Sequence, residues 1–174
     1  MNNLAELYLA GGCFWGMEHF LKQINGVEKT AVGYANGRTA NPTYREVCDN
    51  DTGYAETVRV FYDPQVLPLS FLLELYFKAI DPTSVERQGG DCGNQYRTGI
   101  YYVCQEDLPV IEAAMRKVAE QYSEPIVVEV MHLQNFYLAE EFHQDYLINN
   151  PTGYCHIDPQ LFEMARRANA SPKK

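Results

Sequence analysis

The sequence predicts an α+β protein that forms one domain over residues 1–174. A length of 174 residues suits one domain, and 46% hydrophobic with 21% charged residues is typical of a globular protein with a core. Apolar strand patterns and helical patterns alternate in the order β-α-β-β-α-β, followed by α-β-α. Two adjacent strands without a helix between them favour a split βαβ, ferredoxin-like two-layer core with long irregular loops.

Hydrophobic periodicity gives the individual elements in order along the chain. A short apolar run ends at Gly11-Gly12, apolar residues at helical spacing follow from Phe14, and Asn25-Gly26 ends that helix. The same patterns predict strands at 7–10, 27–34, 54–62, 99–104 and 126–131, and helices at 14–24, 69–79, 106–122 and 137–148. The Gly- and Asn-rich segment 35–53 and the irregular stretch 82–96 predict long loops. We expect residues 149–174 to be largely irregular.

The charge and the lack of targeting signals restrict the functional classes. A net charge of −9 makes a nucleic acid or an anionic membrane surface an unfavourable partner. No signal peptide precedes the first strand, and no window approaches the roughly 20 apolar residues of a membrane helix. We therefore expect a cytoplasmic protein without nucleic-acid or membrane partners. No heptad repeat predicts a coiled-coil partner, so we expect a monomer.

The five cysteines lack the pattern of a disulfide framework or a metal site. Their number is odd and no Cys-x-x-Cys occurs, so we expect no bound metal. Cys13 falls where a strand ends and a helix starts, and free N–H groups and the helix dipole stabilise a thiolate there. The glycines around it leave the thiol uncrowded, and Phe14 and Trp15 can form an apolar wall beside it. From position alone, a nucleophile and a buried core cysteine are about equally supported.

One carboxylate is predicted on the buried face of a strand. Residues 54–62 alternate, so Tyr54, Glu56 and Val58 share one face, while Arg59 marks the opposite face as the more solvated one. A buried, unpaired carboxylate has a raised pKa and can donate a proton near neutral pH. The alternative is a glutamate at a frayed strand end that reaches water or pairs with an arginine.

The remaining cysteines and the histidines give weaker signals. Cys155 lies in a turn-rich segment near the C-terminus, where mobility can bring one thiol to another, although alone it is read as incidental. Cys48 and Cys104 are predicted to be packing residues, and Asp91 beside Cys92 disfavours a thiolate there. None of the four histidines stands out as a base for a nucleophilic thiol, so a cysteine protease is not supported.

Four segments together resemble the landmarks of the methionine sulfoxide reductase A family. They occur in the family's order, and the resemblance runs from about Leu7 to His156. The segments are Gly12-Cys13-Phe14-Trp15-Gly16, Gly53-Tyr54-Ala55-Glu56, Asp91-Cys92-Gly93-Asn94-Gln95-Tyr96-Arg97 and Asn150-Pro151-Thr152-Gly153-Tyr154-Cys155. The resemblance implies a peptide-methionine (S)-S-oxide reductase, which reduces the S epimer of methionine sulfoxide, free or in proteins, and so repairs oxidised proteins.

The resemblance also implies a role for each matching residue. Cys13 matches the nucleophile that becomes a sulfenic acid, Glu56 the acid that helps protonate the sulfoxide oxygen, and Cys155 the resolving cysteine. A dithiol reductant such as thioredoxin then reduces the disulfide, and no other cofactor is implied. The residues matched to substrate binding are Phe14 and Trp15 around the methyl group, Tyr44 and Tyr96 at the oxygen, and Asp91 near the site.

This sequence departs from the family pattern at two places. Many relatives carry a second recycling cysteine after the Gly-Tyr-Cys turn, whereas Ile157-Asp158-Pro159 follows here, so we expect a single Cys13–Cys155 disulfide. Cys92 occupies a position where the family does not lead us to expect a cysteine. Two other functions stay open. One is a thiol hydrolase or transferase that needs a histidine base and an oxyanion hole near Cys13, and the other is a non-catalytic module that binds a methylated or hydrophobic ligand.

Overall fold

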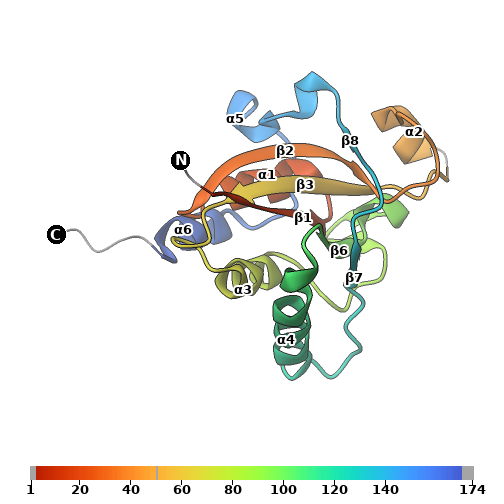
Figure 1. Ribbon diagram of the computed structural model, residues 1–174. Helices are drawn as coiled ribbons and strands as arrows, with labels where there is room; N and C mark the ends of the chain where they lie inside the picture. The colour runs from red at the N-terminus through yellow and green to blue at the C-terminus, as the bar shows by residue number, and fades with distance from the viewer. Residues whose placement is uncertain (1–2, 50, 170–174) are drawn as a thin grey trace.

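The computed structural model describes residues 3–49 and 51–169 and is built around a six-stranded sheet (Figure 1). The strands are β1 (Ala5–Gly11), β2 (Val27–Ala35), β3 (Ala55–Tyr62), β4 (Arg87–Gln88), β5 (Asp91–Cys92), β6 (Thr98–Tyr102), β7 (Glu129–His132) and β8 (Phe136–Leu138). The helices are α1 (Phe14–Lys22), α2 (Tyr44–Asp49), α3 (Leu69–Ala79), α4 (Leu108–Ala119), α5 (Tyr146–Asn149) and α6 (Pro159–Arg167). Short 3-10 turns are η1 (Asn94–Tyr96), η2 (Gln105–Asp107) and η3 (Glu141–His143).

The sheet has the strand order β7-β6-β1-β3-β2-β8. The four central strands are antiparallel to one another, β8 continues the antiparallel pairing beside β2, and β7 lies parallel to β6. The sheet is therefore mixed, and both of its edges are short strands, which limits edge-to-edge association. The mixed helix-and-sheet class predicted from the sequence is confirmed.

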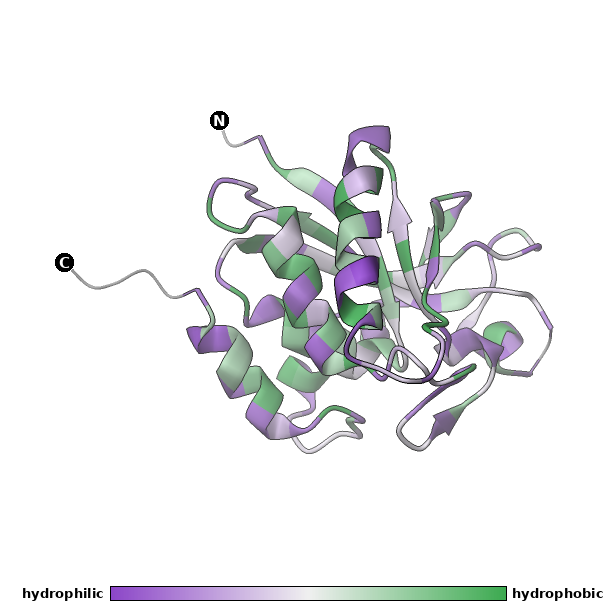
Figure 2. Ribbon diagram, turned by 90° about the horizontal axis from the view of Figure 1, so that it is seen from below, coloured by the Kyte–Doolittle hydropathy of each residue, from purple (hydrophilic) through white to green (hydrophobic). Residues whose placement is uncertain are grey.

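Helices cover one face of the sheet. Their apolar residues pack on the strands in a core that includes Leu9, Val58, Phe20 and Leu73, all completely buried. Seen from below, α3 and α4 lie in front of the strands, and α6 lies beside α3 (Figure 2). A smaller cluster on the opposite face contains Tyr8, Ala10, Ala35, Ala55 and Tyr101. None of the helices described for residues 3–49 and 51–169 has the length and apolar character that a membrane span requires.

Two segments predicted as loops contain regular structure. Segment 35–53 includes α2, because Thr43 and Glu46 form a reciprocal capping box in which each side chain accepts from the other's backbone N–H, at 3.2 and 3.0 Å. Segment 82–96 includes the β4–β5 hairpin, which turns at Gly89 with a left-handed φ of 60°. Both elements carry or flank residues of the candidate site.

The C-terminal third differs most from the sequence prediction. The helix predicted at 137–148 is wrong: Tyr137 pairs with Tyr34 in the β2–β8 ladder, and Asp145 adopts a left-handed φ of 52° that a continuous helix cannot contain. The segment predicted as largely irregular, 149–174, contains α6. This helix begins where the Asp158 side chain accepts from Gln160 N at 2.9 Å, a regular N-cap.

Candidate active site

A tight turn between β1 and α1 presents Cys13. Gly12 has φ +85°, and a Cβ there would lie 2.7 Å from Gln88 Cβ and 2.8 Å from His156 Nε2, so the turn requires glycine. Cys13 is the N-cap residue of α1 and only 6% exposed. The predicted position between a strand and a helix is confirmed. The thiol is more deeply buried than this position alone would require.

Glu56 lies on the helix-covered face of β3, as the alternation predicts. It is 1% exposed, and its Oε1 accepts from the backbone N–H of Phe14 at 3.2 Å. No hydrogen-bond partner for Oε2 occurs in the described part of the chain. Burial, together with the charge of Asp91, raises the pKa of Glu56 to about 8, and the Phe14 N–H opposes this only in part. The carboxyl is therefore mostly neutral at pH 7.

Two phenols face this carboxyl from separate elements. Tyr44 begins α2 and Tyr96 ends η1. Burial raises the pKa of both hydroxyls, and the charge of Glu56 raises them further, so all three groups share one site. Arg97 links η1 to the loop before β3 by donating to Gly53 O at 2.8 Å. Two segments that are 44 residues apart in sequence thus converge at Glu56.

The two aromatic residues after the thiol have different surroundings. Phe14 is completely buried, and its ring centroid lies 6.3 Å from that of Tyr44. Trp15 is partly exposed and stacks on Tyr146 with ring centroids 3.8 Å apart. Its indole Nε1 donates to His143 Nδ1 at 2.9 Å. The pair therefore forms an apolar wall beside the thiol, with Phe14 fixed by the core and Trp15 fixed by the segment around His143.

Cys155 lies over the first turn of α1. A Cβ added to Gly16 would lie 3.0 Å from Cys155 Sγ, so the half-buried thiol packs directly on the helix that follows Cys13. Its neighbour Tyr154 donates to Asp91 Oδ1 at 2.9 Å. Asp91 in turn contributes to the raised pKa of Cys13 and of Cys155, so this carboxylate lies near both thiols. All eight residues named from the sequence are thus brought together.

The electrostatics of Cys13 correct one expectation. A position at a helix start predicts a stabilised thiolate, yet the pKa of this thiol is raised well above its usual range. Burial is the main cause, and the nearby carboxyls of Glu56 and Asp91 add to it, whereas the backbone N–H groups of Trp15 and Gly16 lower the pKa only partly. Desolvation outweighs the helix terminus, so Cys13 is a neutral thiol at pH 7.

Several residues of the site give no local signal in the sequence. Cys48, predicted to be a packing residue, lies near Tyr44, Gln95 and Glu56, and burial is the main cause that raises its pKa. His143 sits behind Trp15, although the sequence places it inside a helix. The contact between them spans 128 positions, so periodicity cannot find it. Cys92 and Cys104 are exposed, and all five cysteines are free thiols.

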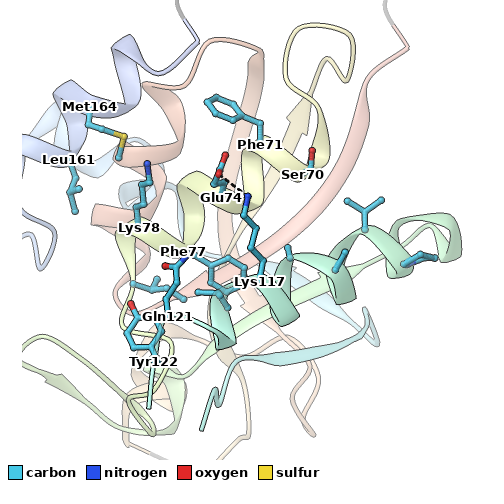
Figure 3. A pocket seen from close by; sticks show the side chains of 16 residues that line it. Ser70, Phe71, Glu74, Phe77, Lys78, Lys117, Gln121, Tyr122, Leu161 and Met164 are labelled. Carbon is cyan, nitrogen blue, oxygen red and sulfur yellow. Dashed lines mark hydrogen bonds and ion pairs between the residues drawn. The ribbon is translucent and has the colours of Figure 1, made fainter. Parts of the chain in front are cut away.

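A groove with a cavity of about 890 Å³ lies apart from these residues (Figure 3). It runs between α3, α4 and α6, and Lys117 pairs with Glu74 across it at 3.4 Å. Its lining contains none of the site residues named above. Within residues 3–49 and 51–169, no group of three His, Cys, Asp or Glu side chains is arranged to hold a metal ion.

Comparisons with known proteins agree on one family. Residues 5–174 match the family described as Peptide methionine sulfoxide reductase. The Peptide methionine sulfoxide reductase MsrA of Lachnoclostridium phytofermentans is 56% identical over 162 residues, which cover 93% of this chain and 98% of that protein. The reduced form of Mxr1 from Saccharomyces cerevisiae is 36% identical, with a TM-score of 0.83 over 87% of this chain and 88% of that one. A structure of Mxr1 in complex with Trx2 matches at 25% identity and a TM-score of 0.59, over 82% of this chain and 84% of that one.

Proposed function

This chain belongs to the peptide methionine sulfoxide reductase family, and we propose that it reduces the S epimer of methionine sulfoxide, free or in proteins, by a cycle on Cys13 and Cys155. One observation carries the proposal: a thiol, a mostly neutral carboxyl and two phenols are gathered in one buried site. A sulfoxide is a poor electrophile until its oxygen is hydrogen-bonded or protonated. Neutral donors held away from water provide that assistance where charge develops.

In the first step, Glu56, Tyr44 and Tyr96 bind the sulfoxide oxygen. Cys13 Sγ attacks the sulfur while Glu56 gives its proton to the oxygen, and the proton of the thiol restores the carboxyl. The hydroxyl then passes from the substrate sulfur to Cys13 Sγ as the bond between the two sulfur atoms breaks. Methionine leaves reduced by two electrons, and Cys13 is oxidised to a sulfenic acid. Because the pKa of Cys13 is raised, its proton leaves only as the oxygen becomes protonated. Phe14 and Trp15 contact the methyl group of the substrate.

In the second step, Cys155 resolves the sulfenic acid. Its sulfur attacks Cys13 Sγ, a disulfide forms, and the hydroxyl leaves as water with the proton of the Cys155 thiol. Asp91 holds this segment through Tyr154. A dithiol reductant then takes the disulfide back to two thiols. Thioredoxin is the proposed reductant, supported by the complex of the related Mxr1 with Trx2.

The test is a turnover assay with an S-methionine sulfoxide peptide. With dithiothreitol, the wild type should release methionine peptide, Cys13→Ser should release none, and Cys155→Ser should remain active. With thioredoxin and its reductase, Cys155→Ser should stop after one turnover. A matched Cys92→Ser variant should behave as the wild type with both reductants, because Cys92 is exposed and takes no part in the proposed steps.

Four results would reject parts of this scheme or favour another function. No methionine from the wild type would reject the reductase. A trapped Cys13–Cys92 or Cys13–Cys48 disulfide in the mass spectrum would reject Cys155 as the resolving thiol. Acyl transfer by Cys13 that needs no Cys155 would favour the hydrolase or transferase, and ligand binding retained by Cys13→Ser without turnover would favour the binding module.

We also infer that the scaffold is a single domain on a split βαβ core. The order β6-β1-β3-β2 with antiparallel neighbours is what two interleaved βαβ units produce, and this supports the inference. The edge strands β7 and β8 are additions to it.

A further inference from the structure

The segment Ala139–Tyr146, which we call the clasp, contacts both sides of the proposed substrate pocket. We propose that the clasp sets the width of this pocket and that His143 is its specificity-determining residue, positioning Trp15 so that a methyl sulfoxide fits and a larger alkyl sulfoxide does not. The inference rests on the proposed reductase function. It assigns a role to side chains that the reaction steps do not use.

On one side, His143 holds the indole of Trp15. The histidine is completely buried, and its Nδ1 accepts from Trp15 Nε1 at 2.9 Å. A ring nitrogen that accepts must be unprotonated, so the proton of this imidazole is on Nε2. Burial keeps the ring neutral by lowering its pKa, although Glu140 opposes this. Tyr146, three residues further, stacks on the indole, and the clasp therefore fixes both the edge and the face of Trp15.

On the other side, Glu140 holds the element that carries Tyr44. Glu140 Oε2 accepts from the backbone N–H of Tyr44 at 3.0 Å, and Oε1 accepts from the hydroxyl of Tyr34 at 2.9 Å. Burial alone would raise the pKa of Glu140, but these hydrogen bonds hold it below its ordinary value, so the carboxylate stays ionised. The imidazole of His143 also lies against the Tyr44 ring, with centroids 4.5 Å apart.

The clasp is itself anchored to the sheet and to α1. The side-chain amide of Gln144 accepts from Val32 N at 2.8 Å and donates to Val32 O at 2.9 Å, as a neighbouring strand would. The backbone N–H of Asp145 donates to Glu18 Oε1 at 2.8 Å. Glu18 is 2% exposed, and its other oxygen accepts from Thr30 at 2.7 Å. This buried carboxylate has no place in the reaction steps, and its contacts are those of an anchor.

These contacts fix the separation of the two sides of the pocket. Glu140 and His143 are joined by the single turn η3, so the Tyr44 and Trp15 sides of the pocket cannot move independently. One methylene group in a rigid apolar pocket is discriminated by roughly 10-fold or more, whereas a pocket with a movable wall adapts. The clasp therefore acts on the choice between alkyl groups more than on the chemical step.

Two substitutions at His143 distinguish the contribution of its hydrogen-bond acceptor from that of its aromatic ring. His143→Asn keeps an acceptor near the Nδ1 position, and His143→Phe keeps an aromatic ring but cannot accept. The measurement is kcat/KM for peptides with S-methionine sulfoxide and S-ethionine sulfoxide. We expect the methyl-over-ethyl ratio to fall at least fivefold in His143→Phe, through the KM values, and to stay within twofold of wild type in His143→Asn. His132→Phe, at an exposed position, is the matched control.

Fluorescence gives a second readout because Trp15 is the only tryptophan. Acrylamide quenching should increase in His143→Phe and remain near the wild-type value in His143→Asn. If His143→Phe does not fold, Tyr146→Leu, which removes the stacked ring from a partly exposed position, should show the same rise in quenching and the same loss of selectivity. An unchanged ratio and unchanged quenching in a folded His143→Phe or Tyr146→Leu variant overturn the proposal. A wild type that releases no methionine instead rejects the underlying reductase function.

Discussion

The backbone N–H of Phe14 donates to Glu56 Oε1, and this bond decides which oxygen of the carboxyl carries its proton. Oε1 must accept, so the proton of the neutral acid lies on Oε2, for which the described residues offer no partner. The residue that follows the nucleophile thus orients the acid. The backbone that carries the thiol is thus bonded to the acid, although 42 positions separate Phe14 from Glu56.

Glu56→Gln should make the protein more stable at pH 8 than the wild type. Folding raises the pKa of this carboxyl from 4.5 to about 8, so the folded chain keeps a proton that the unfolded chain releases. The stability this proton provides is complete below pH 4.5 and is lost as the pH rises to about 8, by on the order of 1.4 kcal/mol per pH unit. Glutamine does not titrate. Urea unfolding at pH 5 and pH 8 measures the difference, and a pH-independent difference between the two proteins would contradict this assignment.

The first turnover should slow above pH 8. The proposed step needs the neutral form of Glu56, whose population falls about tenfold per pH unit above its pKa of about 8. Rapid-quench measurement of methionine formation between pH 6 and pH 10 tests this. The first turnover of Glu56→Gln should be slower by roughly 100-fold or more, and its rate should no longer fall above pH 8. A wild-type rate that climbs from pH 8 to pH 10 would indicate that thiol ionisation, not acid assistance, limits the step.

Gly16→Ala should slow disulfide formation much more than it slows reduction of the sulfoxide. The added Cβ would lie 3.0 Å from Cys155 Sγ and 3.2 Å from His156 Nδ1, so the segment carrying the resolving thiol must shift. We expect methionine release in one turnover to change less than threefold and disulfide formation to slow at least tenfold, as followed by thiol titration. Gly90→Ala is the control, because its Cβ would meet nothing closer than Tyr154 Oη at 3.8 Å. Equal disulfide rates in both variants would refute this reading of the contact.

Tyr76→Phe should destabilise the protein by roughly 1–2 kcal/mol. The completely buried hydroxyl of Tyr76 donates to Ala10 O at 2.6 Å, just before the turn that presents Cys13. Its removal leaves that carbonyl without this donor. The free energy of unfolding in urea measures the effect, and Tyr122→Phe at the surface should change it by less than about 0.5 kcal/mol. A loss equally small for both variants would show that the hydroxyl of Tyr76 contributes little.

Much of the fold follows from local pattern, and the exceptions have physical reasons. Period-two alternation places Glu56 on the covered face of β3 because the side-chain period of a strand is fixed by its backbone. The helix predicted at 137–148 fails because the pairing of β8 with β2 outweighs helical periodicity, and because Gln144 bonds to β2 rather than facing water. The start of α2 was present in the sequence as Thr43 and Glu46 at capping-box spacing, a signal that loop composition obscures.

The site was only partly predictable for a different reason. The positions of Cys13 and Glu56 follow from their elements, but the pKa of Cys13 depends on how deeply the thiol is buried and on carboxylates from other segments. The helix terminus predicts a lowered pKa, and burial reverses the direction. The partners of Trp15 come from the clasp, more than 120 residues later. Such long-range contacts leave no periodic trace in the sequence.

Helix α6 has a consequence for the lifetime of the oxidised enzyme. The segment that carries Cys155 is held before the thiol by Tyr154 on Asp91, and after it by α6, whose Arg166 donates to Gln23 of the α1 C-cap at 2.9 Å. A thiol held beside its target has a high effective molarity, because little conformational entropy remains to be lost on reaction. We therefore expect the sulfenic acid at Cys13 to be captured faster than a second oxidant such as hydrogen peroxide can convert it to the irreversible sulfinic acid.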